Sequence, residues 1–180
     1  ATDFVAGIVG WVDLTDPAIG ENLARLQGSD HGRYLVGIRH QVHDEEDPEW
    51  LLRPEVQRGV AAVGEAGLTY DVLVRSRELP SGLATIRAHP DMRFVVDHIA
   101  KPNIKEREIE PWASRMRPLA DHPNVWVKVS GMITEADWDH WTPADLVPYV
   151  SRLLEWFGPR RLMFGSDWPV CELAGTYERV

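Results

Sequence analysis

Short apolar runs alternate along the chain with longer stretches in which apolar residues recur at helical spacing. The short runs are bounded by glycine, proline or charged residues, a pattern typical of β-strands rather than helices. The pattern predicts six strands, at about residues 6–13, 34–38, 69–74, 93–96, 125–129 and 162–164. We expect the last of these, Leu162–Phe164, to be a buried strand.

The stretches between these runs predict amphipathic helices. The predicted helices span about residues 17–28, 56–67, 81–90, 108–121 and 142–157. Ser81 is expected to cap the third helix. The fifth has a clear start, because Thr142 is followed by Pro143 and, three residues after the threonine, by Asp145.

Strands that alternate with helices indicate a parallel sheet, and eight such units in roughly 250 residues make a TIM barrel. The sequence therefore predicts an α/β fold of the (β/α)8 TIM-barrel type that is incomplete, with about six βα units present. A doubly wound open sheet is the structural alternative, but no glycine-rich phosphate loop follows the first predicted strand. We expect residues 1–180 to form a single partial barrel domain. The chain starts at Ala1 without an initiator methionine and stops at Val180 without a helix after the last strand, so we expect truncation at both ends.

Composition narrows the class of protein. Hydrophobic residues make up 44% and charged residues 26% of the 180 residues, which is ordinary for a globular domain. A formal net charge of -9 argues against a nucleic-acid partner, and no apolar run approaches the roughly 20 residues of a membrane helix. The single cysteine, Cys171, excludes an intrachain disulfide and a cysteine-based zinc site. These features predict a cytoplasmic protein, and they leave oligomerisation open.

Ionisable side chains gather at the carboxyl ends of the predicted strands. Parallel strands bring these ends to one face, which is the active face of barrels. The residues are Asp13, Arg39, His40, Arg75, Asp97, His98, Lys128 and Asp167. Because such groups follow or end every predicted strand, we favour a functional site over ordinary loop polarity.

His98 and Asp167 are the sharpest pair in this set. An imidazole and a carboxylate together either bind one divalent metal ion or act as acid and base on a water molecule. Two ligands rarely hold a catalytic zinc, which takes three ligands plus water. The structural alternatives are a hydrogen-bonded core histidine for His98 and a helix or turn cap for Asp167.

The cationic members of the set suit substrate binding. Arg39, Arg75 and Lys128 can hold a carboxylate, hydroxyls or a developing oxyanion. The alternative is a set of salt bridges to Asp13, Asp97 and the acidic loop near residue 45. His40 either extends the cluster or points outward, because neighbouring residues in a strand face opposite sides.

Four motifs give the chain a recognisable resemblance. They are Gly37-Ile-Arg-His40, Val96-Asp-His-Ile-Ala-Lys-Pro102, Val127-Lys-Val-Ser-Gly131 and Phe164-Gly-Ser-Asp-Trp-Pro169. In this order they resemble the amidohydrolase superfamily, and within it the amidohydrolase-2 branch of L-fucono-lactonase, L-rhamnono-lactonase and pyrone-dicarboxylate lactonase. The resemblance covers essentially the whole chain.

The resemblance implies a distorted (β/α)8 barrel of which the first two strands are missing, including a His-x-His pair that this sequence lacks. It matches His98 to the histidine of the sixth barrel strand and Asp167 to the aspartate of the eighth. Arg75 stands where metal-dependent members commonly have a histidine. The expected cofactor is therefore none, or one divalent metal, with zinc first, bound by His98 and Asp167.

The implied activity is a hydrolase reaction of carbohydrate metabolism that opens a sugar-acid lactone, such as an L-fucono-lactone. Asp167 would activate water, with His98 beside it as a second catalytic residue. Arg39, His40, Arg75 and Lys128 would bind substrate, and Trp168, together with Trp11, would wall an apolar side of the sugar. The alternatives are a metal-dependent decarboxylase of the same superfamily and a catalytically incomplete fragment.

Overall fold

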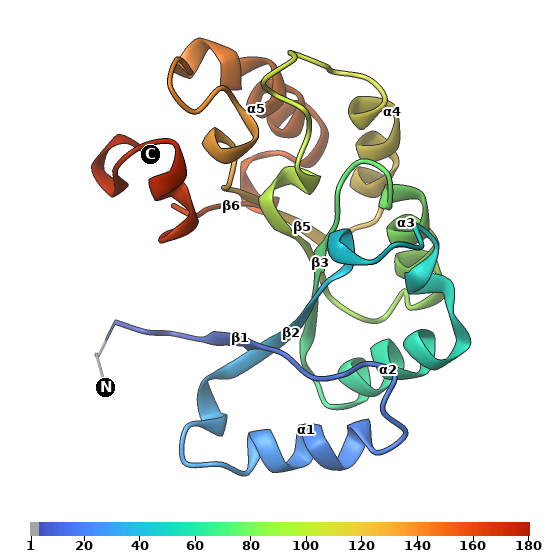
Figure 1. Ribbon diagram of the computed structural model, residues 1–180. Coiled ribbons are helices and arrows are strands. Elements are labelled where there is room, and N and C mark those ends of the chain that lie inside the picture. Colours follow the sequence, from blue (N-terminus) through green and yellow to red (C-terminus); the bar gives the residue numbers. More distant parts are fainter. Residues whose placement is uncertain (1–3) are drawn as a thin grey trace.

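The computed structural model describes residues 4–180, and its centre is one curled parallel sheet (Figure 1). Six strands pair in chain order, each with the next, as parallel neighbours. They are β1 (Ile8–Gly10), β2 (Leu35–Gln41), β3 (Thr69–Leu73), β4 (Phe94–Val96), β5 (Val125–Val129) and β6 (Leu162–Phe164). The sheet forms part of a barrel, so the predicted incomplete TIM-barrel-type fold is confirmed.

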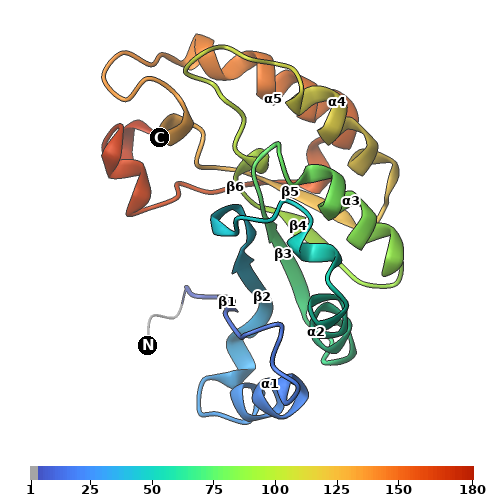
Figure 2. The same cartoon turned by 45° about the vertical axis from the view of Figure 1, so that its right-hand side comes forward.

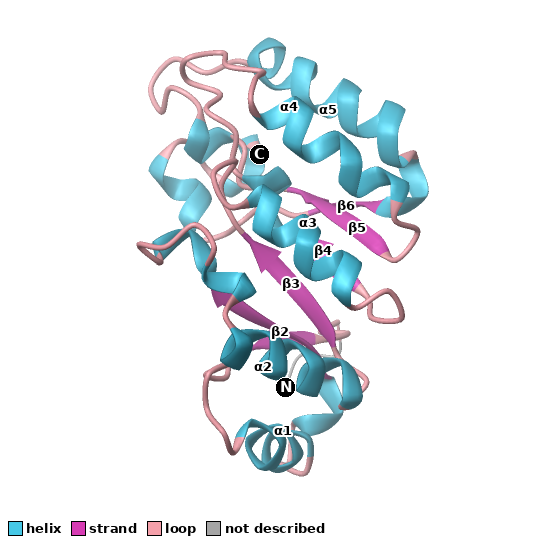
Figure 3. Ribbon diagram, turned by 90° about the vertical axis from the view of Figure 1, so that its right-hand side faces the viewer, coloured by secondary structure: helices cyan, strands magenta, loops and turns pink. Residues whose placement is uncertain are grey.

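Helices follow the strands and cover the outer side of the sheet (Figures 2 and 3). They are α1 (Ile19–Gln27), α2 (Pro54–Glu65), α3 (Leu79–Ala88), α4 (Trp112–Met116) and α5 (Pro143–Phe157). All five predicted helices are present. The fourth is shorter than expected, because it begins only after Pro111 and continues beyond Met116 as a 3₁₀ helix over Arg117–Asp121.

Of the two predicted helix-capping residues, Thr142 and Ser81, one prediction is confirmed and the other is wrong. Thr142 caps α5 through a capping box, in which Asp145 accepts hydrogen bonds from the Thr142 amide and hydroxyl, both at 2.9 Å. The prediction for Ser81 is wrong, because α3 already begins at Leu79 with Glu78 as its N-cap. The buried Ser81 hydroxyl instead lies near the carbonyls of Pro48 and Glu78.

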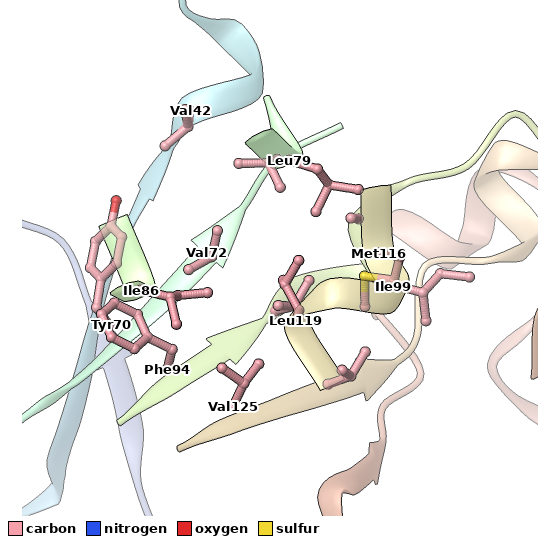
Figure 4. Close-up of a cluster of buried hydrophobic side chains, with 14 of the residues drawn as sticks. Val42, Tyr70, Val72, Leu79, Ile86, Phe94, Ile99, Met116, Leu119 and Val125 are labelled. Carbon is pink, nitrogen blue, oxygen red and sulfur yellow. The ribbon is translucent and has the colours of Figure 1, made fainter. Parts of the chain in front are cut away.

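The main core lies between the sheet and the helices (Figure 4). The outward-facing strand residues Tyr70, Val72, Phe94 and Val125 are all 0–1% exposed. Strand register places Arg39 opposite Asp71 and His40 opposite Val72. Because side chains alternate along a strand, Arg39 and Asp71 face the inside of the curl while His40 shares the outer side with Val72.

The two edges of the sheet are exposed, and this corrects the expectation for the last strand. Met163 is 37% and Phe164 76% exposed, so β6 is not buried. On the opposite edge, Ile8 of β1 is 46% exposed. Among the described residues β1 and β6 each pair with only one strand, so their outer edges lack a neighbouring strand. Within residues 4–180, no helix combines the length and the apolarity needed to cross a membrane.

Two helical glycines give a matched test of this packing. A Cβ on Gly59 of α2 would lie 2.1 Å from the Leu14 carbonyl oxygen, whereas a Cβ on the exposed Gly20 of α1 would meet nothing within 4 Å. We therefore expect Gly59→Ala to destabilise the complete protein by about 1–3 kcal/mol through overpacking. Gly20→Ala should instead stabilise it by about 0.5–1 kcal/mol through reduced backbone entropy. Urea unfolding measures both, and equal effects of the two changes would contradict the close contact of α2 with Leu14.

Candidate active site

A strained turn directly after β4 presents His98. Four successive residues, His98, Ile99, Ala100 and Lys101, have positive φ values of 49°, 47°, 57° and 46°. Residues other than glycine avoid this left-handed conformation, which costs about 1–2 kcal/mol per residue. Such strain persists only where the surroundings hold it in place, and it clusters at functional sites.

Asp167 lies just past β6, also at a positive φ of 59°. Its Oδ1 is 3.5 Å from His98 Nε2, and the two side chains are only 14% and 13% exposed. This separation is longer than a good hydrogen bond, as is common for catalytic contacts before substrate arrives. The structure thus brings together the two residues that the sequence singled out, while their chemical roles stay predictions.

Ser130 and Gly131, which follow β5, complete the surroundings of the pair. The Ser130 hydroxyl lies 2.8 Å from His98 Nδ1. Gly131 has a φ of 60°, and a Cβ there would lie 2.9 Å from His98 Cγ and 3.0 Å from Asp167 Oδ2. Position 131 therefore needs glycine both for its backbone conformation and for the space that the pair occupies.

The surroundings of His98 favour its neutral form. Burial lowers the pKa of His98, although the carboxylates of Asp167 and Asp97 oppose this effect. A neutral imidazole carries one proton, and the carboxylate beside Nε2 favours that proton on Nε2. In this tautomer the Ser130 hydroxyl donates to Nδ1, and the Nε2–H points toward Asp167.

A buried charge network lies on the inner face of the sheet. Lys128 Nζ of β5 lies 2.5 Å from Asp71 Oδ2 of β3 and 2.7 Å from Asp97 Oδ1 at the end of β4. Arg39 of β2 donates to Asp97 Oδ2 at 3.1 Å. Asp71 and Asp97 are 1% and 0% exposed, so water hardly reaches the two carboxylates, whereas the cations Lys128 and Arg39 are 26% and 41% exposed.

The pKa shifts in this network follow from burial and charge. Burial raises the pKa of Asp71, and the nearby Asp97 carboxylate raises it further against the pull of Lys128. Burial by itself would lower the pKa of Lys128, but the charges of Asp97 and Asp71 outweigh it and raise that pKa. Lys128 therefore stays an ammonium ion, and it is the cation that compensates both acids.

A second ion cluster lies beside the strained turn. Glu135 accepts from Arg75 at 3.0 Å and also pairs with Lys101, the last residue of the turn. Glu135 and Lys101 are each 12% exposed, whereas Arg75 is 49% exposed. Of the predicted cations, Arg39 and Lys128 pair with Asp97, as the salt-bridge alternative expects, whereas Arg75 pairs with Glu135 rather than with one of the acids that this alternative named.

His40 and Trp168 lie apart from these networks. His40 stacks on Trp50 with ring centroids 4.3 Å apart, accepts from Trp11 Nε1 at 3.3 Å and lies 2.7 Å from Glu45. Trp168 is 62% exposed and donates to Glu172 at 3.0 Å. Its ring borders an open hollow of about 1050 Å³ that is also lined by Ser166, Thr176, Tyr177 and Arg179.

A metal ion would find an incomplete ligand set here. Among residues 4–180, no group of three or more histidine, cysteine, aspartate or glutamate side chains is placed to hold one. His98 and Asp167 supply two donors, and a catalytic zinc needs a third protein ligand. These residues by themselves therefore do not fit a zinc centre.

Sequence reasoning missed several residues of the site, namely Asp71, Lys101, Ser130, Gly131 and Glu135. One of them had a clear signal, since an acid inside the apolar run Thr69–Val74 must be paired if the strand is buried. Ser130 and Gly131 stand in a motif that carries the resemblance, but nothing local shows that they contact His98. Glu135 has no signal in the sequence at all.

Comparison with known proteins finds one matching family model and several relatives of similar sequence. The sequence model of the amidohydrolase family matches residues 1–180. An L-fucono-1,5-lactonase of Burkholderia ambifaria is 42% identical over 176 residues, which are 98% of this chain and 59% of that protein. One of Burkholderia multivorans is 39% identical, with 98% of this chain and 62% of that protein covered. The chain thus spans about three fifths of the curated relatives that it matches.

A solved structure agrees with the fold. The crystal structure of an amidohydrolase from Burkholderia multivorans with bound zinc superposes with a TM-score of 0.86 at 39% identity. The match covers 96% of this chain and 62% of that one. The zinc belongs to that protein, whose remaining length has no counterpart in this chain.

The inner network predicts a pH-dependent effect of Lys128→Met. Loss of the ammonium leaves the buried Asp71 carboxylate without a paired cation and leaves Asp97 with Arg39 alone, and we expect a loss of about 3–5 kcal/mol in unfolding free energy at pH 7. A carboxyl whose folded pKa is raised contributes stability below its ordinary pKa of 3.8 and loses it as the pH rises through the folded value. The deficit of the variant should therefore shrink as the pH falls from 7 toward 4.

Urea unfolding across that pH range measures the effect in the complete protein. Lys105→Met is the matched control, because this lysine is exposed and lies outside the network. A deficit that does not change with pH, or one shared by the control, would contradict the assignment of Lys128 as the compensating cation.

Proposed function

The chain belongs to the amidohydrolase family, and from that premise we propose that its protein hydrolyses the lactone of a sugar acid. The observation that supports this most is the close approach of the Asp167 carboxylate to the neutral imidazole of His98, at 3.5 Å, at the carboxyl ends of the strands. The relatives at 42% and 39% identity are L-fucono-1,5-lactonases, so the substrate class we propose is a similar aldono-lactone.

The proposed reaction needs a base for water and donors for the oxyanion. Asp167 accepts a proton as water attacks the lactone carbonyl, so that a carbon–oxygen bond forms and the carbonyl oxygen becomes negative. The ring carbon–oxygen bond then breaks, and the proton held by Asp167 passes to the departing ring oxygen. The products are a free hydroxyl and a carboxylic acid on one open chain.

His98 and the inner cations supply the electrostatic part of the proposal. The Nε2–H of neutral His98 is a donor beside Asp167, so it can bind the carbonyl oxygen or orient the carboxylate. Arg39 uses one N–H on Asp97 and is 41% exposed, which leaves further donors free for substrate oxygens. Lys128 is 26% exposed and uses two contacts on the acids, so its third proton has the same use.

Sugar recognition would come from groups around the pair. Trp168 offers an exposed ring face beside an open hollow, which suits the apolar side of a sugar. Arg75 is half exposed and suits hydroxyl binding even while it is paired with Glu135. His40 is stacked on Trp50 and bonded to Glu45, so we give it the weakest part in this proposal.

Metal dependence, location and assembly belong to the same proposal. We infer either no cofactor or one divalent ion, with zinc first because a 39% identical structure holds it. His98 and Asp167 would be its ligands from this chain, and no step above passes through it. We further propose one partial barrel domain over residues 1–180 and a cytoplasmic location, with oligomerisation open.

Asp167→Asn tests the proposed base. Asparagine tolerates the positive φ at this position, so the change removes the charge with little backbone strain. In the complete protein we expect kcat for lactone opening to fall about 10²–10⁴-fold. Asp13→Asn is the control, because Asp13 also lies near a strand end but bonds only to its own turn at Thr15.

The assay follows acid release from a panel of aldono-lactones, with and without a chelator. Activity that resists the chelator and is lost only in Asp167→Asn supports a metal-free lactonase. Activity lost with the chelator and restored by zinc supports the metal-dependent form. An Asp167→Asn variant with near-normal turnover would refute the assignment, and absent lactonase activity with bound metal would favour a decarboxylase.

A further inference from the structure

The strained turn after β4 is anchored from the helix layer as well as from the site. Ile99 and Ala100 are both 0% exposed, and Figure 4 shows Ile99 within the buried cluster. Inside the turn, the Lys101 amide donates to the His98 carbonyl at 2.8 Å. Four left-handed residues in succession do not hold themselves, so neighbouring groups must fix their backbone.

One such group is the indole of Trp112. Its Nε1–H donates to the Ile99 carbonyl oxygen at 2.7 Å, and the tryptophan is 1% exposed. A buried hydrogen bond of this length fixes the direction of the peptide between Ile99 and Ala100. That peptide is next to the residue whose imidazole faces Asp167, so its orientation bears directly on where His98 points.

Trp112 is itself held by the outer helices. It is the first residue of α4, and its ring packs against Tyr149 and Trp156 of α5 with centroids 5.3 Å and 5.7 Å away. Figure 3 shows α4 and α5 side by side on the outer side of the sheet. The indole therefore reaches the turn from the helix layer, and among residues 4–180 it forms no hydrogen bond with His98 or Asp167.

We propose that Trp112 is a positioning residue, whose indole N–H fixes the left-handed turn and so sets the approach of His98 to Asp167. Ser130 and Glu135 hold the same turn from the β5 side, at His98 and at Lys101. The turn is thereby clamped between the helix layer and the loop after β5. The consequence for turnover rests on the proposed lactonase function, whereas the consequence for the backbone does not.

A matched pair of variants in the complete protein tests this. Trp112→Phe removes the N–H and keeps an aromatic ring. Trp141→Phe removes an equivalent bond, because Trp141 is 4% exposed and donates to the Ala174 carbonyl at 2.7 Å. The readouts are thermal unfolding, hydrogen–deuterium exchange of residues 97–101, and kcat and KM for lactone opening.

We expect both variants to lose a similar amount of thermal stability. Trp112→Phe should also speed amide exchange in residues 97–101 and lower kcat by roughly tenfold to a hundredfold, the loss that a small misplacement of a catalytic group produces. Its KM should change by less than about threefold, because the substrate-binding groups stay in place. Trp141→Phe should leave the exchange of these residues and kcat near their original values.

Lost stability in Trp112→Phe without faster exchange in residues 97–101 would overturn the proposal, as would equal kcat losses in both variants. If Trp112→Phe does not fold, benzothienylalanine at position 112 removes the N–H while it keeps the shape of the indole, and the same comparison applies. Should the original protein open no lactone, the proposed function fails, and the exchange comparison alone decides the role of Trp112.

Discussion

The ammonium group of Lys128 links the buried acids on the inner face of this sheet. Lys128 reaches from β5 to a carboxylate on β3 and another at the end of β4, and the latter also binds Arg39 of β2. Four strands are therefore connected through two buried carboxylates and their cations, and loss of Lys128 would leave the buried Asp71 without a paired cation. The network fixes the end of β4, where the chain turns toward His98.

A strained backbone turn that follows Asp97 positions the candidate site. After Asp97 the chain enters a left-handed turn, which aims His98 across the strand ends toward Asp167. Ser130 and Gly131 close around the pair, one through its hydroxyl and the other through the absence of a side chain. Burial lowers the pKa of His98 and so favours a neutral imidazole beside the Asp167 carboxylate, and the proposed hydrolysis rests on this arrangement.

The two faces of the sheet carry different kinds of side chain. The outer face packs apolar side chains against the helices, whereas the inner face holds acids and cations, and the His98–Asp167 pair lies just past the strand ends. The Trp112–Ile99 contact joins these layers, since an indole of α4 bonds to the turn that carries His98. The exposed edges at β1 and β6 belong to a chain that spans about three fifths of its lactonase relatives.

The sequence by itself determined the order of strands and helices, because periodicity and breakers act locally, and it identified His98 and Asp167 from their place after strands. Tertiary structure decided what those residues meet. Ser81 does not cap α3 as predicted, and β6 is exposed. Glu135 pairs with Arg75 and Lys101, which lie 60 and 34 positions before it in the sequence. Such contacts depend on the curl and register of the sheet, and no local pattern encodes which distant side chains share a buried space.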